Sequence, residues 1–363
     1  MVFRSHAPWL LACLGGVFAG GCGPGGEFGD ADAAPADAAP LDYDASLAPE
    51  TLSQSGLYAD TAAGVLGPGV RVYEPRFELW SDGAEKQRWI ALPDGAQIDN
   101  TEGDFWTYPE GTRVWKQFAK DGVKLETRLL FKDGPAAGDW YVMSYVWNDD
   151  ETDAIAAPGG ELNARGMGHR VPSQADCREC HEPMHDVVLG FSAIQLDRDP
   201  AEAGADITLD DLLTEGRLLY GTGSAGYPHY PLPGSESERE VLGYLHGNCS
   251  GCHNRRSPVL AEVGARPLLL ARTSERYRSS VEATPAYEST VGVRAISTDE
   301  ARSLIAPGAP DDSAVYLRMS SRAPTLMMPP LGSEIVDEEA TTGVRTWIES
   351  MPAAAGAAAT PAR

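Results

Sequence analysis

Two short motifs combine two thiols and an imidazole in the same order and spacing. Each reads Cys-x-x-Cys-His, and the residues are Cys177, Cys180 and His181 in the first and Cys249, Cys252 and His253 in the second. Cysteines three positions apart lie about one helical turn apart, as two thioether bonds to the vinyl groups of one haem require. The adjacent histidine then lies beneath the iron as its proximal ligand. The two motifs predict two covalently attached c-type haems.

A redox dithiol, a zinc site and disulfides are the alternatives for these cysteines. Neither motif lies in the βαβ pattern of a thioredoxin-like protein. Zinc ribbons space their pairs about 15–20 residues apart, far less than the separation of Cys180 from Cys249. The sequence holds six cysteines, and the remaining two, Cys13 and Cys22, fall in its N-terminal segment. Covalent haem is therefore the favoured interpretation.

A methionine before proline marks the expected distal ligand of the second haem. The segment 327–332 reads Met-Met-Pro-Pro-Leu-Gly ahead of a predicted helix. A thioether ligand favours ferrous iron and raises the reduction potential. Met328 directly precedes Pro329, so we choose it over Met327. Two core methionines on a turn are the alternative.

The distal ligand of the first haem stays open. Met184 and His185 follow His181 too closely to reach the opposite face of the ring. The other candidates are Met143, Met167, His169, His229, His246 and Met319.

Helical patterns surround the second motif. Ser235–Leu245 predicts a short helix with Val241, Leu242 and Leu245 on one face. A second helix is expected from about Val336, because apolar residues recur there on one stripe as far as Met351. These helices predict a cytochrome c-like domain over residues 235–352. The segment 171–234 carries the first haem, and a capped helix is expected within it at Thr208–Leu219.

The region before the first motif has a different pattern. Residues 70–150 hold six of the eight tryptophans, Trp80, Trp89, Trp106, Trp115, Trp140 and Trp147. Alternating runs such as Lys124–Phe131 are separated by turn pairs such as Asp121-Gly122. They predict an antiparallel, sandwich-like β-rich domain over residues 51–170, and the fold class α+β. Such tryptophans more often pack a core than bind carbohydrate or a partner.

The N-terminal segment has the pattern of an export signal. Arg4 and His6 precede a short apolar stretch at 9–19, and Ala19-Gly20-Gly21-Cys22 resembles a lipobox in which Cys22 is lipidated. We expect a lipoprotein signal peptide at 1–22, a disordered acidic tether at 23–50 and a disordered tail at 353–363. An ordinary signal peptide is the alternative. The protein is expected in the cell envelope, either periplasmic or lipid-anchored to the outer membrane.

The formal net charge of −24 restricts the kinds of partner that the chain can bind. So acidic a chain repels phosphate backbones, which argues against nucleic acid as a partner. Redox partner proteins are expected instead, and the membrane through the lipid anchor.

Three segments resemble a family of exported bacterial dihaem c-type cytochromes of uncharacterised function. They are Val171–His181 around the first motif, Val241–Asn254 around the second, and Ile305–Gly332, which includes Met328. The resemblance spans roughly Tyr73 to Met351. It implies a β-rich N-terminal region, haem at both motifs and a C-terminal cytochrome c segment, but no catalysed reaction.

Electron transfer between redox partners is the function we expect from these features. A dihaem peroxidase-like enzyme with an open first haem is one alternative. The other is a ligand-binding β module with a redox accessory domain.

Overall fold

The computed structural model describes residues 48–182, 184–204, 206–220, 229–255, 257, 267–295 and 303–353. All of these belong to one compact unit. The expected signal peptide with Cys22, most of the expected tether and the tail from residue 354 lie outside the described residues. No helix in the described part is long and apolar enough to span a bilayer.

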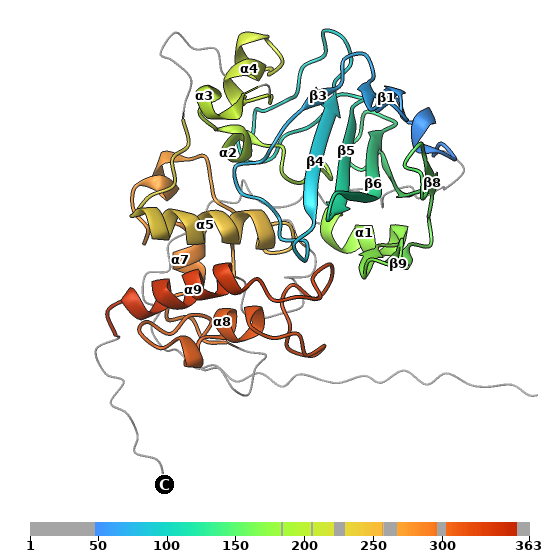
Figure 1. The fold of residues 1–363 in the computed structure, drawn as a ribbon. Coiled ribbons are helices and arrows are strands. Elements are labelled where there is room, and N and C mark those ends of the chain that lie inside the picture. Colours follow the sequence, from blue (N-terminus) through green and yellow to red (C-terminus); the bar gives the residue numbers. More distant parts are fainter. Residues whose placement is uncertain are drawn as a thin grey trace, which may run out of the picture. The chain divides into compact units, whose positions relative to one another are not determined.

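A six-stranded antiparallel sheet forms the N-terminal part of the fold (Figure 1). Its strands follow one another in chain order as a meander: β3 (Arg71–Val72), β4 (Glu85–Ala91), β5 (Arg113–Lys120), β6 (Val123–Lys132), β7 (Trp140–Trp147) and β8 (Ala154–Ala156). Asp121 and Gly122 join β5 to β6 with φ angles of 51° and 76°. Positive φ at both positions is the turn that an Asp-Gly hairpin favours, as predicted.

The expected α+β class and antiparallel strands are confirmed, but the sheet differs from a sandwich. The six main strands lie in one sheet, and two hairpins stand apart from it: β1 (Tyr58–Asp60) with β2 (Val65–Leu66), and β9 (Glu161–Ala164) with β10 (His169–Val171). Short helices and turns cover the apolar faces of the sheet that a second large sheet would cover in a sandwich.

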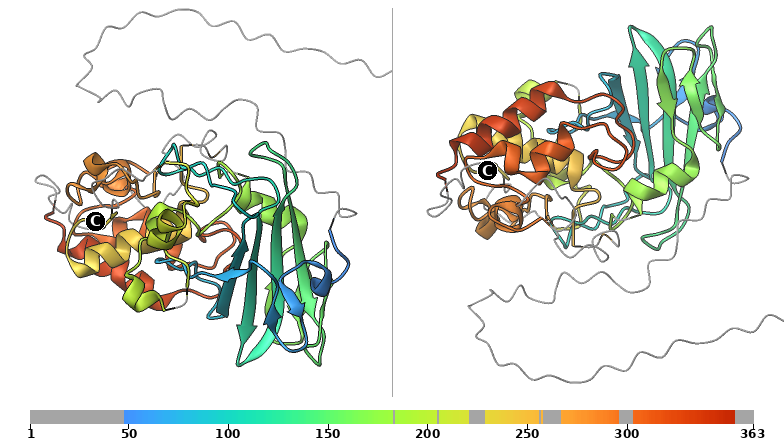
Figure 2. Two further views of the ribbon diagram at one scale, coloured as in Figure 1. Left: turned by 90° about the horizontal axis from the view of Figure 1, so that it is seen from above. Right: turned by 90° about the horizontal axis from the view of Figure 1, so that it is seen from below.

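Each face of the sheet packs against a different part of the chain. One face carries Trp89, Trp115, Leu129 and Met143 in register, and these residues form a core with Leu52 and Leu57 from the turn η3 (Leu52–Gln54) and its neighbour. The opposite face carries Ile90, Val114, Leu130 and Val142 in register. That face packs against α1 (Gln174–His181), α2 (Ala193–Leu196) and α4 (Leu209–Thr214). Figure 2 shows the sheet from above and below, with η3 and β1 on the outer face.

Five of the six tryptophans in this region are buried. Only Trp80 is partly exposed. The role of the five buried tryptophans is core packing, as the pattern predicted. These five therefore provide no exposed aromatic surface on which a carbohydrate could stack.

The C-terminal part is helical around the second motif. α5 (Glu236–Cys249) packs against α9 (Glu338–Ser350), with α7 (Pro285–Thr290), α8 (Ala314–Met319) and the turns η4 (Glu275–Arg278) and η5 (Pro310–Asp312) beside them (Figure 1). Their core contains Leu242, Leu245, Val344, Trp347 and Ile348. Both predicted helices are thus present, although α9 begins at Glu338 and α5 continues as far as Cys249.

The helix expected at Thr208–Leu219 is shorter than predicted. Thr208 caps it by accepting a hydrogen bond from the backbone N–H of Asp211, and α4 ends at Thr214. Gly216 follows with a φ of 68°, and the N–H of Arg217 donates to the carbonyl of Leu212. A left-handed glycine directly after a helix closes its last turn, so the remaining predicted residues run on as an extended segment. A short helix α3 (Pro200–Ala203) precedes α4.

Candidate functional site

The first motif lies on the short helix α1. Ser173 caps its start by accepting from the N–H of Asp176, and the Asp176 carboxylate accepts in return from the N–H of Ser173. This capping box fixes the first turn. Cys177, Cys180 and His181 therefore occupy the last two turns of the helix, with Cys177 buried against the sheet. The spacing predicted from the sequence is realised on a helix.

A backbone hydrogen bond orients His181. Its Nδ1 lies 2.7 Å from the carbonyl oxygen of Val187. Because a carbonyl only accepts, Nδ1 carries the proton and donates it, which leaves Nε2 as the atom with a free lone pair. Burial lowers the pKa of His181 to about 4, so the ring is neutral at neutral pH. A neutral imidazole with Nδ1–H bound to a carbonyl is the arrangement typical of a metal-ligating histidine.

The sheet in turn fixes the Val187 carbonyl. Val187 has a φ of 65°, a region that costs a β-branched residue of order 1–3 kcal/mol. Its neighbour Asp186 is held from three sides: by Lys132 at 2.5 Å, by the indole N–H of Trp140 at 2.7 Å and by the N–H of Tyr108 at 2.6 Å. The side chains of Lys132 and Asp186 are both fully buried. The strained conformation therefore persists because these contacts over-determine it.

No pattern in the sequence predicted this network. Lys132 has its place in register on β6, but its partner Asp186 lies in an irregular segment after the motif. We call Lys132, Asp186 and Val187 the His181 support.

The second motif spans the end of α5 and the turn after it. Cys249 is the last residue of the helix, and the N–H groups of Cys252 and His253 both donate to the carbonyl of Cys249. The carbonyl of His253 accepts from the N–H of Leu269 at 2.9 Å. Burial lowers the pKa of His253 and so favours the neutral ring, although the nearby carbonyl of Pro267 acts in the opposite direction. The Nδ1 atom of His253 has no hydrogen-bond partner among the described residues.

The two motifs contact each other, which the sequence did not predict. The Cys252 Sγ lies 3.6 Å from the carbonyl oxygen of Glu179, within the first motif. The side-chain amide of Asn254 lies 3.8 Å from the sulfur of Met184. A hydrogen bond between the Cys180 and Cys252 thiols lowers the pKa of Cys180 to about 7 and raises that of Cys252. All four cysteines in the described part of the chain are free thiols.

A segment between β3 and β4 joins the two halves of the site. Phe77 lies over Gly243 and Gly247 on α5, where a Cβ atom at Gly247 would come within 2.6 Å of the Phe77 carbonyl oxygen. The side chain of Asn248 accepts from the N–H of Trp80 at 2.6 Å and donates to the carbonyl of Glu78. α5 is therefore anchored to the chain that leads into the sheet.

The predicted distal ligand Met328 lies in the irregular segment between α8 and α9. Its side chain is half-buried, and its N–H donates to the carbonyl of Arg318 at 3.0 Å. The segment ahead of a terminal helix matches the expected location. Iron ligation by Met328 stays a prediction.

The candidates for the distal ligand of the first haem have other contacts. His169 binds Glu126 through Nε2 at 2.7 Å, and His229 binds Asp197 at 2.7 Å. His185, which the sequence already excluded, binds the Thr107 hydroxyl at 3.0 Å. These histidines hold other side chains in this conformation.

The remaining candidates lie in packed positions. Met143 belongs to the core on the sheet face opposite to the one that packs against Cys177, and Met319 belongs to the core around α5 and α9. Met167 packs beside Leu125. His246 accepts from the N–H of Ala271 at Nδ1. The structure singles out no distal ligand for the first site.

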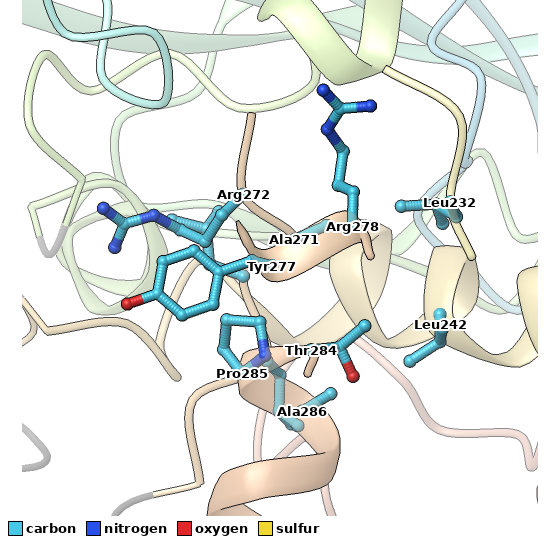
Figure 3. A pocket seen from close by; sticks show the side chains of 11 residues that line it. Leu232, Leu242, Ala271, Arg272, Tyr277, Arg278, Thr284, Pro285 and Ala286 are labelled. Atoms are coloured by element: carbon cyan, nitrogen blue, oxygen red, sulfur yellow. The ribbon is translucent and has the colours of Figure 1, made fainter. Parts of the chain in front are cut away.

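A shallow pocket lies beside α5, between the segment 269–272, η4 and the start of α7 (Figure 3). Leu232, Leu242 and Ala286 form part of its apolar lining, and Arg272 at its rim forms an ion pair with Asp104. None of the predicted haem-binding residues lines this pocket.

Comparison of the chain with family models, with curated proteins and with solved structures found no match.

Proposed function

We propose that this chain is an exported dihaem c-type cytochrome that transfers electrons between redox partner proteins. The observation that carries the proposal is the pair of Cys-x-x-Cys-His motifs, which the fold brings into contact with each other. When bound, haem iron would supply one-electron chemistry by cycling between its ferric and ferrous states.

The donor set of the first site fits covalent haem. Cys177 and Cys180 are free thiols one helical turn apart, available for two thioether bonds. His181 keeps Nε2 for the iron because Nδ1 donates to Val187. The role of the chain at this site is to hold a neutral imidazole in one orientation and to bury it.

The second site offers the same donors in a helical frame. Cys249 and Cys252 are free, and His253 lies in the turn after α5. We assign Met328 as the distal ligand here, because it directly precedes Pro329 in the segment ahead of α9. A thioether ligand would raise the reduction potential of this haem. With its own distal ligand, this site is suited to electron transfer alone.

The location follows from the N-terminal pattern. We propose that Cys22 is lipidated after export and that the protein is anchored to the outer membrane or lies in the periplasm. The net charge of −24 would steer a basic partner protein toward it and keep nucleic acid away.

Intact-mass measurement of the exported, mature protein tests the proposal. We expect two haems per chain, and one haem in a variant with Cys177→Ala and Cys180→Ala. A control variant at an exposed serine far from both motifs in sequence, Ser53→Ala, should keep both. A mature wild-type chain without haem would rule the proposal out.

A peroxidase-like enzyme with an open first site is the second candidate. It is favoured because His169, His185 and His229 form hydrogen bonds with other side chains, so that none of these three is free to bind the iron of the first haem in this conformation. Carbon monoxide added to the ferrous protein separates the two functions. Rapid binding at one haem supports the enzyme, whereas binding at neither supports pure electron transfer.

A further inference from the structure

A row of polar residues crosses the inner face of the sheet beside the first motif. Arg88, Lys116, Arg128 and Ser144 stand in register on β4, β5, β6 and β7. They point to the same face as Ile90, Val114, Leu130 and Val142, each of which lies two residues away on the same strand, because side chains alternate along a strand. This second row shares a core with Cys177. The polar row therefore lies on the side of the sheet that carries the first motif.

Two buried atoms of this row have no hydrogen-bond partner among the described residues. Arg88 is only 4% exposed, and its Nη1 donates to Glu78 at 2.8 Å, while its Nη2 is unpartnered. Ser144 is 2% exposed, and its hydroxyl is unpartnered as well. Leaving a buried donor unsatisfied costs about 1–3 kcal/mol. Two such donors in one row indicate a site for an acceptor.

Lys116 in the middle of the row has no carboxylate within ion-pair distance in the described part. Its ammonium lies 4.8 Å from the centre of the Phe118 ring, and the guanidinium of Arg128 lies 4.3 Å from the same ring. Lys116 is partly buried, and cation–π contacts of this kind offset only part of the cost of removing its charge from water. Without an anion, burial and the neighbouring cations lower the pKa of Lys116 well below its ordinary value, and an anion bound in the row would oppose that shift and keep the ammonium charged.

The charges of the region do not balance. Lys86, on the same face, and Arg88 share Glu78 at 3.4 and 2.8 Å, and Arg128 binds Glu126 at 2.6 Å. Four cations thus have two carboxylates as ion-pair partners among the described residues, on a chain whose net charge is −24. We call Lys86, Arg88, Lys116 and Arg128 the cationic row. Two of its positive charges are left without a counter-charge.

The first motif packs on this same face of the sheet. Cys177 lies in one core with Val114, Leu130 and Val142, each two residues from a member of the polar row. At the start of the same helix, the side-chain amide of Gln174 donates to the carbonyl of Val142 at 2.8 Å. A group attached to the motif therefore lies beside the face of the sheet that carries the row.

We propose that the cationic row and Ser144 bind the two carboxylate side chains of the haem attached at the first motif. This inference rests on the proposed function. Two ionised carboxylates would neutralise the two unmatched charges and accept hydrogen bonds from Arg88 Nη2, Lys116 Nζ and Ser144 Oγ. A free inorganic anion has the same chemistry and is the competing source of negative charge.

The test is the reduction potential of the haem-loaded, full-length protein with Lys116→Gln. A nearby positive charge favours the ferrous state, so its removal should lower one of the two potentials. We expect about a tenfold shift of the ferric–ferrous equilibrium, which is about 59 mV for a one-electron couple. The other potential should move far less, and Lys116→Arg, which keeps the charge, should restore the wild-type value.

Arg113→Gln is the matched control. Arg113 lies on the same strand, but its guanidinium lies 4.7 Å from the Phe131 ring, on the opposite face of the sheet. The Arg113→Gln variant removes the same charge from the chain and should leave both reduction potentials nearly unchanged. An equal shift with Arg113→Gln would mean that only net charge matters, and would overturn the inference.

Inorganic phosphate separates the two sources of the anion. If haem carboxylates fill the row, phosphate added at constant ionic strength leaves the wild-type potentials unchanged. A phosphate-dependent potential in the wild type that Lys116→Gln abolishes would assign the row to a free anion instead. The haem count keeps this test apart from the proposed function: fewer than two haems contradicts that function, whereas two haems with unmoved potentials contradicts only the inference.

Discussion

The two Cys-x-x-Cys-His sites use the same residues but are held by different means. At the first site, a buried network rooted in the sheet orients His181, through Lys132, Asp186 and the carbonyl of Val187. At the second, His253 follows a long helix whose apolar face packs on α9. One site is positioned by directional polar contacts and the other by apolar packing. Polar contacts fix an orientation more narrowly, but they fail more abruptly when one partner is removed.

The largest expected effect is at the second site. Met328→Ala should abolish the thioether-to-iron charge-transfer band at the red end of the ferric spectrum, because the sulfur ligand is gone. The same variant should allow carbon monoxide to bind the second ferrous haem.

Met327→Ala is the control for this variant, since it removes a methionine from the neighbouring position. It should leave the band in place. If the band survives Met328→Ala and disappears with Met327→Ala, the ligand assignment moves by one residue.

The next largest expected effect is a loss of stability when the His181 support is disrupted. Asp186→Ala leaves the fully buried ammonium of Lys132 without its partner, and breaking a buried pair in this way costs about 3–5 kcal/mol. We expect the free energy of unfolding to fall by about this amount in urea denaturation. Adding Lys132→Met to Asp186→Ala removes the unpaired charge and should regain part of the loss.

An exposed ion pair gives the contrast. Arg71 and Glu215 lie 2.9 Å apart with both side chains about 40% exposed, and Glu215→Ala should cost less than about 1 kcal/mol. Equal costs for Glu215→Ala and Asp186→Ala would contradict the idea that the first site depends on a buried polar network.

Near the second site, His246 is expected to make the free energy of unfolding depend on pH. This residue is buried against the α5–α9 core region, and burial lowers its pKa to about 4, from about 6.5 when unfolded. Between these values the unfolded chain binds the extra proton, so stability is complete above about pH 6.5 and falls as the pH drops toward 4. The loss should reach up to about 3 kcal/mol.

The measurement is the difference in unfolding free energy between wild type and His246→Gln across this pH range. The variant lacks the titrating ring, so its stability should depend less on pH in this window. Parallel pH profiles for the two proteins would rule out His246 as the source.

The sequence predicted the elements and the donors, because both depend on local spacing. The cysteines and histidines of the motifs, the Asp121-Gly122 turn and the apolar stripe of α9 are all readable within a few neighbouring residues. The structure confirms the turn and the helix α9, with the start of the helix shifted by two residues, and it places Cys252 and His253 in a turn after α5. Haem attachment and the role of Met328 stay predictions.

Contacts between distant segments were not predictable. The pairing of Lys132 with Asp186, the alignment of Arg88 with Lys116 and Arg128, and the contact of Cys252 with Glu179 depend on sheet register and on how irregular segments return to it. Hydrophobic alternation and a tight turn set the register of strands joined by a hairpin, but they do not show how strands joined by a long connection align or where an irregular segment returns to the sheet. The sandwich was wrong for the same reason, because alternation predicts strands but not how many sheets they form.

The smallest expected effect tests the junction between the two sites. Gly247→Ala would place a Cβ atom 2.6 Å from the carbonyl oxygen of Phe77, which is backbone and cannot rotate away. We expect a loss of about 1–3 kcal/mol in the free energy of unfolding, as is usual for overpacking. Gly343→Ala on α9 is the matched control, since its Cβ would meet only Val241 at 3.8 Å, an ordinary contact. That variant should be neutral or more stable by about 0.5–1 kcal/mol, because alanine favours a helix over glycine. A neutral Gly247→Ala would show that α5 can shift away from the Phe77 segment without cost, and the two sites would then be less firmly joined than their contacts indicate.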